Sequence, residues 1–318
     1  MGTEERLGSA TPDRIPEGRP CLIVRPRDGG GRVGRELPEV VRYLRDNAVR
    51  PVVVEAPRAG EGGVRAREAV EAGGRYLVSV GGDGLAREVV AAVMESPFAG
   101  EVALSVLSAG SDCDFVKTFG LPPDAATAAP RLLTGREYPI DVVRVTCTAP
   151  GGGTRVTHFA GLAEVGLWGT ATRRAAHLPA WLGRVRPFAA FWWTMGTFRV
   201  PEMTVTADER VYRGPAHEVV VGNTQMARSG IRISPRSFPG DGVVDVLVMR
   251  GPRSDHYRLL PKMFLGEQVP NPGIVELRAQ KRVEIESSRP AWIQADTEPI
   301  GLTPAVFEVL PEALRLVV

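Results

Sequence analysis

The sequence contains few of the residues that build disulfide frameworks or metal sites. Only three cysteines occur among its 318 residues, Cys21, Cys113 and Cys147, and they show no CxxC spacing. No two of the four histidines lie three or four residues apart. An odd cysteine count without paired spacing argues against a disulfide scaffold and a zinc site. We therefore expect a cytoplasmic protein with reduced thiols.

Long apolar runs and an excess of one charge are also missing. No stretch reaches the roughly 18 apolar residues that span a bilayer. Residues 1–19 lack the apolar core of a secretory signal, and we expect a flexible tail there. The 39 basic residues are balanced by 37 acidic ones, for a formal net charge of +2. This balance argues against nucleic acid as a partner. It leaves open a transient contact of the arginines with an anionic membrane surface, and also a homodimer.

The first part of the chain shows the alternation of strand and helix patterns that is typical of an α/β protein. Helical patterns follow three apolar runs, at Leu37–Leu44, Val64–Ala72 and Ala86–Met94. The expected strands are Cys21–Val24, Pro51–Glu55, Tyr76–Val80 and Val102–Leu107, with Pro51–Glu55 predicted to be buried. Strands that alternate with helices predict a parallel, doubly wound sheet. Ligands bind at the carboxyl ends of such strands, where the glycine-containing loops of this region fall.

After Ile140 the sequence changes to short β-like runs separated by turn residues. These runs are Val142–Thr148, Thr154–Phe159, Glu202–Ala207, Glu218–Val221, Val243–Met249, Arg282–Ile285, Trp292–Ala295 and Val306–Leu310. Two helical stretches interrupt them, at 170–198 and 255–265. We predict an α/β nucleotide-binding domain at 20–138 and an antiparallel β-sandwich substrate domain at 139–318. A ligand cleft is expected between them, and the last strand can return to the first domain.

The sharpest local signal is Gly81-Gly82-Asp83-Gly84, which follows an expected strand and begins a helix. Glycines let backbone N–H groups approach phosphate oxygens, and a helix N-terminus adds partial positive charge. A carboxylate would repel phosphate directly, so Asp83 would hold Mg²⁺ through water or act near an accepting hydroxyl. The alternative is a tight turn in which Asp83 caps the helix.

This stretch resembles the GGDG signature of the diacylglycerol-kinase catalytic domain, a family that also holds sphingosine and ceramide kinases. Glu88 and Val89 match the Glu-Val pair of the family. Leu85 replaces the Thr that is usual in bacterial members and is similar to the sphingosine-kinase form. Leu85 removes a hydroxyl that could bond phosphate, but it does not argue against activity.

Two further loops carry the resemblance. The run from Leu107 to Pro122 is similar to the second nucleotide loop of the family, with Cys113 in place of Asn. The first loop departs most, because Arg25 stands where the family has Asn; it would meet phosphate or remain a solvated surface charge. The resemblance implies that ATP is bound by Arg25, Gly29, Gly81, Gly82, Asp83, Gly84, Leu85, Glu88, Gly110, Ser111 and Asp114.

In the second part of the chain, Pro239–Val246 matches a turn in which family members can hold a structural Mg²⁺. The resemblance implies ligation by the Asp241 carboxylate and the carbonyls of Phe238 and Val243. The alternative is an ordinary β-turn with Asp241 at a favoured position, which is the simpler interpretation.

Near the end of the chain, Asp296-Thr297-Glu298 resembles an Asp-Gly-Glu stretch of the family, with Thr297 in place of Gly. In bacterial relatives this Asp is the proposed general base. Two acids spaced two apart on a strand would point to one face, where they could hold a metal or raise the pKa of one carboxyl. We predict Asp296 as the base, with Glu298 beside it and Asp83 as the rival, and surface acids as the alternative.

The most aromatic stretch of the chain lies between Trp181 and Phe198. Core packing is the simpler interpretation of this run. The alternative is a lip for lipid access beside Arg184 and Arg186.

Together these patterns predict a kinase that transfers the γ-phosphoryl group of ATP·Mg²⁺ to a hydroxyl of a lipid, such as diacylglycerol or a sphingoid-like lipid, in phospholipid biosynthesis. Two alternatives stay open because the departures from the family cluster in the loops. One is a kinase of the same fold that acts on a small hydroxylated metabolite. The other is a catalytically silent protein that binds a lipid or metabolite.

Overall fold

The computed structural model describes residues 18–109, 113–227, 230–251 and 273–318, which form two compact units. The first unit comprises the chain up to Val142 and also Pro311–Val318 at the end of the sequence. The second unit comprises Val143–Ala227 and Ile231–Leu310. Three sequence predictions fall outside the described residues. They are the tail, of which only residues 18 and 19 are described, the helix at 255–265, and the site residues Gly110 and Ser111.

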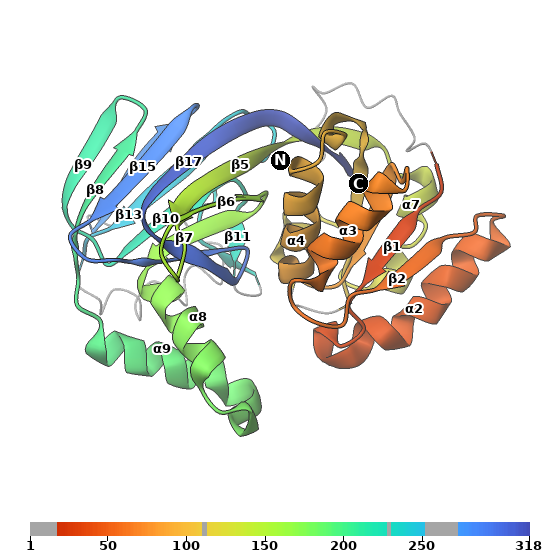
Figure 1. The fold of residues 1–318 in the computed structure, drawn as a ribbon, viewed down its shortest axis with the longest axis horizontal. Coiled ribbons are helices and arrows are strands. Elements are labelled where there is room, and N and C mark those ends of the chain that lie inside the picture. Colours follow the sequence, from red (N-terminus) through yellow and green to blue (C-terminus); the bar gives the residue numbers. More distant parts are fainter. Residues whose placement is uncertain (1–17, 110–112, 228–229, 252–272) are drawn as a thin grey trace. The chain divides into compact units, whose positions relative to one another are not determined.

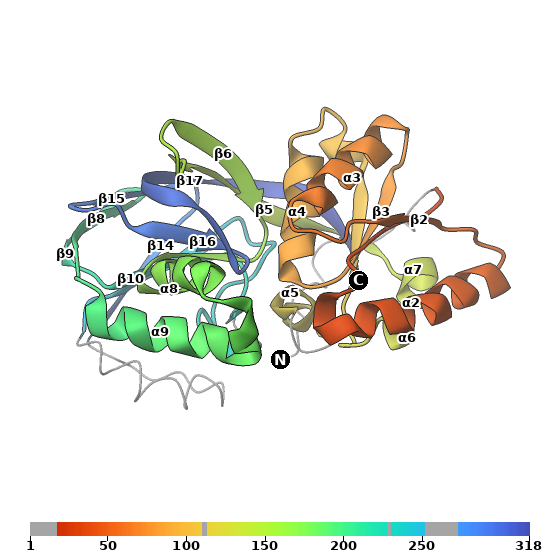
Figure 2. The ribbon, with the colours of Figure 1, turned by 60° about the horizontal axis from the view of Figure 1, so that its bottom comes forward.

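The first unit is built on a parallel sheet. Its strands lie in the order β2 (Val52–Glu55), β1 (Cys21–Val24), β3 (Tyr76–Val80), β4 (Ala103–Leu107) and the end of β17 (Glu298–Val317). On one face lie α3 (Glu61–Glu71) and α4 (Asp83–Met94), and on the other α2 (Asp28–Asp46), α6 (Ala125–Ala128) and α7 (Arg131–Thr134) (Figures 1 and 2). The chain order reverses between β1 and β3, which is where doubly wound sheets bind ligands. The predicted α/β class is confirmed.

The prediction that Pro51–Glu55 is a buried strand is wrong in one respect. The strand forms as β2, but Val52 and Val53 are 40% and 41% exposed. Among the described residues β2 is the last strand of the sheet and pairs only with β1, so within this part of the chain one of its edges is uncovered. An apolar run alone does not distinguish an edge strand from a central one.

The second unit is antiparallel and rich in strands, as predicted. One series of neighbours is β14 (Ile274–Ala279), β13 (Val244–Met249), β10 (Glu218–Gly222), β7 (Leu162–Gly166), β16 (Trp292–Ala295) and the start of β17. A second series is β9 (Arg210–Pro215), β8 (Glu202–Ala207), β15 (Arg282–Ser287), the middle of β17, β5 (Glu137–Thr148) and β6 (Thr154–Phe159). A small separate sheet pairs β11 (Met226–Ala227) with β12 (Ile231–Arg232). Buried side chains from both series form one core.

The helical stretch predicted at 170–198 is divided in two. The structure has α8 (Leu167–His177), a 3₁₀ segment at Ala180–Val185 and α9 (Arg186–Thr197). Leu178 is extended because it precedes Pro179, and this ends α8. Pro187 occupies the first turn of α9, where its missing N–H costs no hydrogen bond. Figure 1 shows α8 and α9 lying against each other.

The remaining helices are short. A 3₁₀ turn at Ala99–Glu101 leads into β4, and α5 (Asp114–Thr118) follows the second predicted nucleotide loop. In the part of the chain that the structure describes, no helix is both long and apolar enough to cross a membrane.

Candidate functional site

The loop after β1 meets the loop after β4 at a point where only glycine fits. Gly29, Gly30 and Gly31 all have positive φ, at 60°, 67° and 82°. A Cβ on Gly29 would lie 1.9 Å from the carbonyl oxygen of Ala109. The three glycines form a left-handed turn at the start of α2. This brings the first predicted nucleotide loop against the second.

The loop after β3 is joined to both of these loops. The Gly82 N–H donates to Asp28 Oδ2 at 2.9 Å, and the Gly81 N–H donates to the Leu107 carbonyl at 2.9 Å. A Cβ on Gly81 would approach Asp28 Oδ2 to 2.8 Å. The three loops therefore converge at the carboxyl ends of β1, β3 and β4, with the N-terminus of the twelve-residue helix α4 among them.

Asp83 is buried, and its carboxylate is directed at the second loop. Asp83 Oδ2 accepts from the Asp114 N–H at 2.9 Å, and Oδ1 accepts from the Phe115 N–H at 3.0 Å. These N–H groups belong to the first turn of α5, which has no helical partner for them. Asp83 thus caps the helix of a different loop, whereas the sequence suggested a cap of its own helix. Asp114 is in turn ion-paired with Lys117 at 3.0 Å.

Arg25 and Glu88 form a buried ion pair, 2.8 Å between Nη2 and Oε1. Glu88 also accepts from the N–H groups of Gly60 and Gly62, both at 2.8 Å. The Arg25 guanidinium donates further to the Ala56 carbonyl. The sequence suggested that Arg25 contacts phosphate or is a solvated surface charge. In the structure its ion pair with Glu88 is part of a network that holds the start of α3 against α4. The sequence could not reveal this pairing because the partners lie 63 residues apart.

Leu85 and Cys113, two departures from the family pattern, are both buried. Leu85 is fully enclosed, and its side chain lies under Gly81 and Gly62, where added Cβ atoms would come within 2.8 and 2.4 Å of it. Burial, with Asp83 nearby, raises the pKa of the Cys113 thiol well above its usual range. Both substitutions therefore place neutral groups beneath the loops.

The backbone at the converging loops could hold a nucleotide phosphate group. Added Cβ atoms at Gly29 and Gly81 would collide with protein atoms of the neighbouring loops, so glycine is required for the loops to pack against one another. A helix N-terminus adjoins this backbone and favours negative charge. Gly84 lies in the first turn of α4 and belongs to the same surface.

The turn predicted to hold a structural metal is an exposed, internally paired loop. Asp241 Oδ1 accepts from the Val243 N–H at 3.1 Å, and Oδ2 lies 3.4 Å from Arg278. The Phe238 carbonyl accepts from the Gly240 N–H at 2.9 Å. The Arg278 guanidinium already places positive charge beside the Asp241 carboxylate, which a metal cation would need as a ligand. Among the described residues no group of three or more His, Cys, Asp or Glu side chains could hold a metal ion.

Asp296 and Glu298 do not extend from one face of a strand, which corrects the sequence prediction. Asp296 and Thr297 have φ of 45° and 71° and form the two-residue turn between β16 and β17. Positive φ at both positions is the pattern of a type I′ hairpin turn. Glu298 begins β17 and pairs with Ala295.

The Asp296 carboxylate turns back onto the segment between β6 and β7. Its Oδ1 accepts from the Leu162 N–H at 2.9 Å and its Oδ2 from the Gly161 N–H at 3.4 Å. A Cβ on Gly161 would lie 2.1 Å from Oδ1, so the absence of a side chain at Gly161 admits the carboxylate. Asn223, which is buried, fixes the same segment by donating to the Ala160 carbonyl at 2.7 Å.

A buried acid that the sequence reading missed lies at the N-terminus of α8. Glu218 is fully buried, and its Oε2 accepts from the Trp168 N–H at 2.8 Å, while Oε1 has no hydrogen-bond partner among the described residues. Burial raises the pKa of Glu218 to about 8. On the neighbouring strands, Gln294 bridges Glu164 and Thr172. Nothing in the sequence distinguishes Glu218 from a surface acid at the start of a strand.

Comparisons with known proteins agree on two domains. Residues 19–145 match the diacylglycerol kinase catalytic domain, and residues 161–318 match the YegS C-terminal NAD kinase beta sandwich-like domain. The chain is 27% identical over 297 residues to proteins named "Probable lipid kinase YegS-like" from Klebsiella pneumoniae (strain 342) and from Citrobacter koseri. In both cases the match covers 91% of this chain and 93% of the relative.

The same fold occurs in solved structures. A diacylglycerol kinase from Bacillus anthracis str. Sterne superposes with a TM-score of 0.69 at 21% identity, over 94% of this chain and 96% of that one. At this identity the likeness concerns the fold alone.

Proposed function

Because the chain belongs to the diacylglycerol-kinase catalytic-domain family, with a YegS-type C-terminal domain, we propose that it is an ATP-dependent kinase of a lipid hydroxyl. The observation that carries this proposal is the convergence of three loops at the carboxyl ends of β1, β3 and β4. Gly29, Gly81 and Asp83 are each fixed there by contacts between these loops. The comparisons support a lipid kinase, and diacylglycerol and sphingoid lipids are the acceptors that the proposal names.

In this proposal the nucleotide phosphates lie on the backbone of Gly81–Leu85 and on Gly29. Asp83 positions the second loop through the N–H groups of Asp114 and Phe115, and Arg25 with Glu88 positions the start of α3. Gly110 and Ser111 would contribute to the same nucleotide site from the second loop. Mg²⁺ bound with ATP would neutralise phosphate charge, which is most of what phosphoryl transfer requires. It would arrive with the nucleotide, and the turn at Asp241, with the carbonyls of Phe238 and Val243, is the proposed place of a structural Mg²⁺.

Asp296 is the proposed general base. Two N–H groups hold its carboxylate in one orientation. A carboxylate fixed in this way can take the proton of an accepting hydroxyl. Glu298, one residue beyond the turn, is the proposed companion acid.

The experiment has two readouts. Calorimetric titration of ATP, with and without Mg²⁺, should show binding in the micromolar range, about −8 kcal/mol. Transfer of labelled γ-phosphate should then be measured to diacylglycerol, a sphingoid base and a panel of soluble alcohols. We expect ATP binding to depend on Mg²⁺ and a lipid to be the preferred acceptor.

The two alternatives give different results in this experiment. ATP binding with a soluble alcohol as the best acceptor would replace the lipid by a small metabolite. A folded protein that binds no ATP would contradict the kinase and leave a silent binding protein.

A further inference from the structure

The hairpin formed by α8 and α9, residues 167–197, exposes large aromatic side chains. Trp181 is 83% exposed, Phe188 67%, and Trp192 and Trp193 are each 54% exposed. The sequence interpretation of this stretch as core packing is therefore wrong for these four residues, although Phe191 is buried as predicted. Isolated exposed aromatics are ordinary, but four on one short segment form an apolar patch that has to be explained.

The charged side chains of the segment that carries this patch have one sign. Residues 165–201 contain five arginines and no Asp or Glu. Arg174 donates to the hydroxyls of Thr194 and Thr197, and Arg186 donates to the Ala175 carbonyl. In the described part of the chain neither of these arginines has a carboxylate partner. The rest of the chain balances its charges, so the imbalance is a local feature of the hairpin.

A pocket of about 470 Å³ opens on the same hairpin. Its lining comes from α8, the residue after α8, α9 and β16: Arg173, Arg174, His177, Leu178, Trp193 and Trp292. The guanidinium of Arg173 lies 5.1 Å from the centre of the Trp292 ring, and that of Arg174 lies 4.9 Å from the Trp193 ring. The aromatic faces thus hold two cations at the pocket without neutralising them.

The five tryptophans of the chain are all part of this region. Trp168 stacks on Phe191 at 4.4 Å inside the hairpin, and the other four are the exposed or pocket-lining residues already named. Tryptophan is the side chain best suited to a boundary between water and hydrocarbon, because it is large, apolar and carries one N–H donor.

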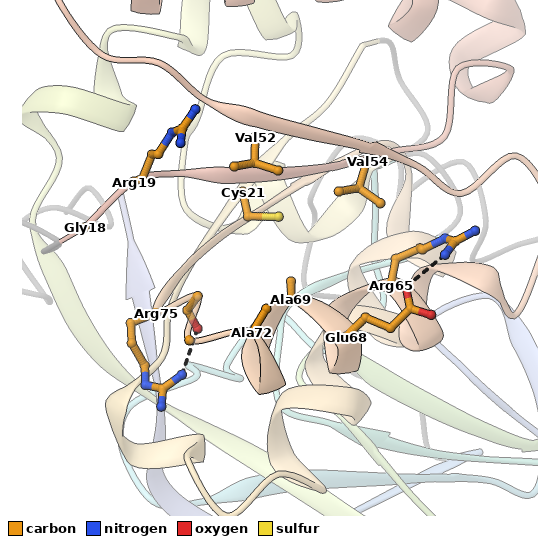
Figure 3. A pocket seen from close by; sticks show the side chains of 12 residues that line it. Gly18, Arg19, Cys21, Val52, Val54, Arg65, Glu68, Ala69, Ala72 and Arg75 are labelled. Carbon is orange, nitrogen blue, oxygen red and sulfur yellow. Dashed lines mark hydrogen bonds and ion pairs between the residues drawn. The ribbon is translucent and has the colours of Figure 1, made fainter.

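A larger hollow elsewhere in the molecule does not carry a comparable argument. It has about 730 Å³ and lies between β2 and α3, at the amino ends of the strands (Figure 3). Arg65 on its wall is paired with Glu68, and Arg75 is paired with Glu101. The cations of Arg65 and Arg75 on its wall are therefore already neutralised.

We propose that the α8–α9 hairpin is a docking surface for an anionic phospholipid membrane. Trp181, Phe188 and Trp192 enter the interface between head groups and acyl chains, and a head-group phosphate occupies the pocket beside Arg173 and Arg174. Charge complementarity favours this occupant, since a segment with five arginines and no acid matches an anionic bilayer. A second copy of the chain would bring the same positive charge against itself. The inference goes beyond the proposed kinase activity, because docking needs neither ATP nor turnover.

The test is flotation of the full chain with phosphatidylcholine vesicles that contain either no or about 30% phosphatidylglycerol, without ATP. Intrinsic fluorescence provides a second readout, since every tryptophan reports on the hairpin. We expect a blue shift and binding only with phosphatidylglycerol, weakened by salt as the surface charges are screened.

Two variants separate the apolar and the charged contributions. Trp181→Ala with Phe188→Ala should weaken binding at least about tenfold through lost apolar burial. Arg173→Gln with Arg174→Gln should weaken it about 25-fold, at roughly fivefold for each cation near an anionic surface. The matched control is Val211→Ala with Arg213→Gln, exposed residues of β9 on the same unit, which should bind like the original chain.

Several outcomes would overturn the proposal. Equal binding to both vesicle types would remove the role of the arginines. Folded hairpin variants that bind as tightly as the original chain would place the surface elsewhere. A dimer in sedimentation that becomes monomeric on Trp181→Ala with Phe188→Ala would identify the occupant as a second copy. None of these results depends on whether the protein is a kinase.

Discussion

At the scale of single residues, several side chains that the sequence presents as site residues prove to hold the backbone in place. Asp83 accepts two N–H groups from another loop, and Glu88 accepts two N–H groups and a guanidinium. A buried acceptor that loses such partners costs free energy, because the groups left behind stay away from water. Changes at these positions therefore act on stability as well as on binding.

Asp83→Asn should lower the free energy of unfolding by about 1–3 kcal/mol, because an amide can accept at only one of its two atoms. Urea denaturation measures this, with Asp46→Asn on the exposed end of α2 as the control. Unchanged stability combined with lost ATP binding would contradict the capping role and indicate that Asp83 acts on the nucleotide directly.

Glu218→Gln should change the pH dependence of stability. The pKa of Glu218 is raised to about 8 in the folded protein by burial, so the folded state holds the proton more tightly than the unfolded one. The contribution to stability is complete below the unfolded pKa, near 4.5, and is lost as the pH rises through 8. The midpoint of thermal unfolding should therefore fall less for the Gln variant between pH 5 and pH 8.5. Glu209→Gln, which is exposed, should follow the original chain; parallel profiles for both variants would contradict the buried acid.

At the scale of elements, glycines and turns decide how the loops meet. The loop after β1 can approach the loop after β4 only because residue 29 has no Cβ. In the turn between β16 and β17, by contrast, the β-branched Thr297 adopts a φ of 71°, a conformation that favours glycine. One position requires glycine and has it, whereas the other favours glycine and lacks it.

Gly29→Ala should cost more stability than Gly152→Ala. Both residues have positive φ, but an added Cβ at Gly152 meets nothing within 4 Å, and at Gly29 it meets the Ala109 carbonyl. The left-handed conformation alone costs about 1–2 kcal/mol, and the collision at Gly29 adds to it and displaces the loops. Thermal unfolding and ATP titration measure both effects, and equal losses in the two variants would contradict the close approach.

Thr297→Gly should stabilise the second unit, by about 0.5–1 kcal/mol once the greater freedom of glycine in the unfolded chain is counted. Thr297→Asn, which tolerates the same conformation, should have a smaller effect of the same sign. Urea denaturation gives the comparison. A loss of stability with Gly would show that the Thr side chain contributes more than the strain of its backbone.

At the scale of the whole molecule, β17 belongs to both units. Its start pairs with β16, its middle with β15, and Arg315–Val317 pair in parallel with β4. Leu314 and Leu316 are fully buried. The end of the chain is therefore part of the core of the first unit, although it follows the whole second unit in sequence.

Leu316→Ala should destabilise the first unit by about 2–5 kcal/mol through the cavity it leaves. Hydrogen exchange should become faster in β3 and β4 and stay unchanged in β10 and β13, which lie in the other unit. Val211→Ala, exposed on β9, serves as the control. Equally faster exchange in both units would contradict this assignment and indicate that they unfold together.

The sequence by itself determined the alternation of strands and helices, the change to antiparallel strands after Ile140, and the glycine loops that begin α2 and α4. These features depend on apolar periodicity and on backbone freedom, which are local properties. The tertiary structure alone decided the pairing of Arg25 with Glu88, the orientation of Asp296 toward Gly161 and the exposure of the aromatic hairpin. Each of these features depends on whether a segment distant in sequence covers the residue, and on which segment it is. Local sequence patterns do not contain this information.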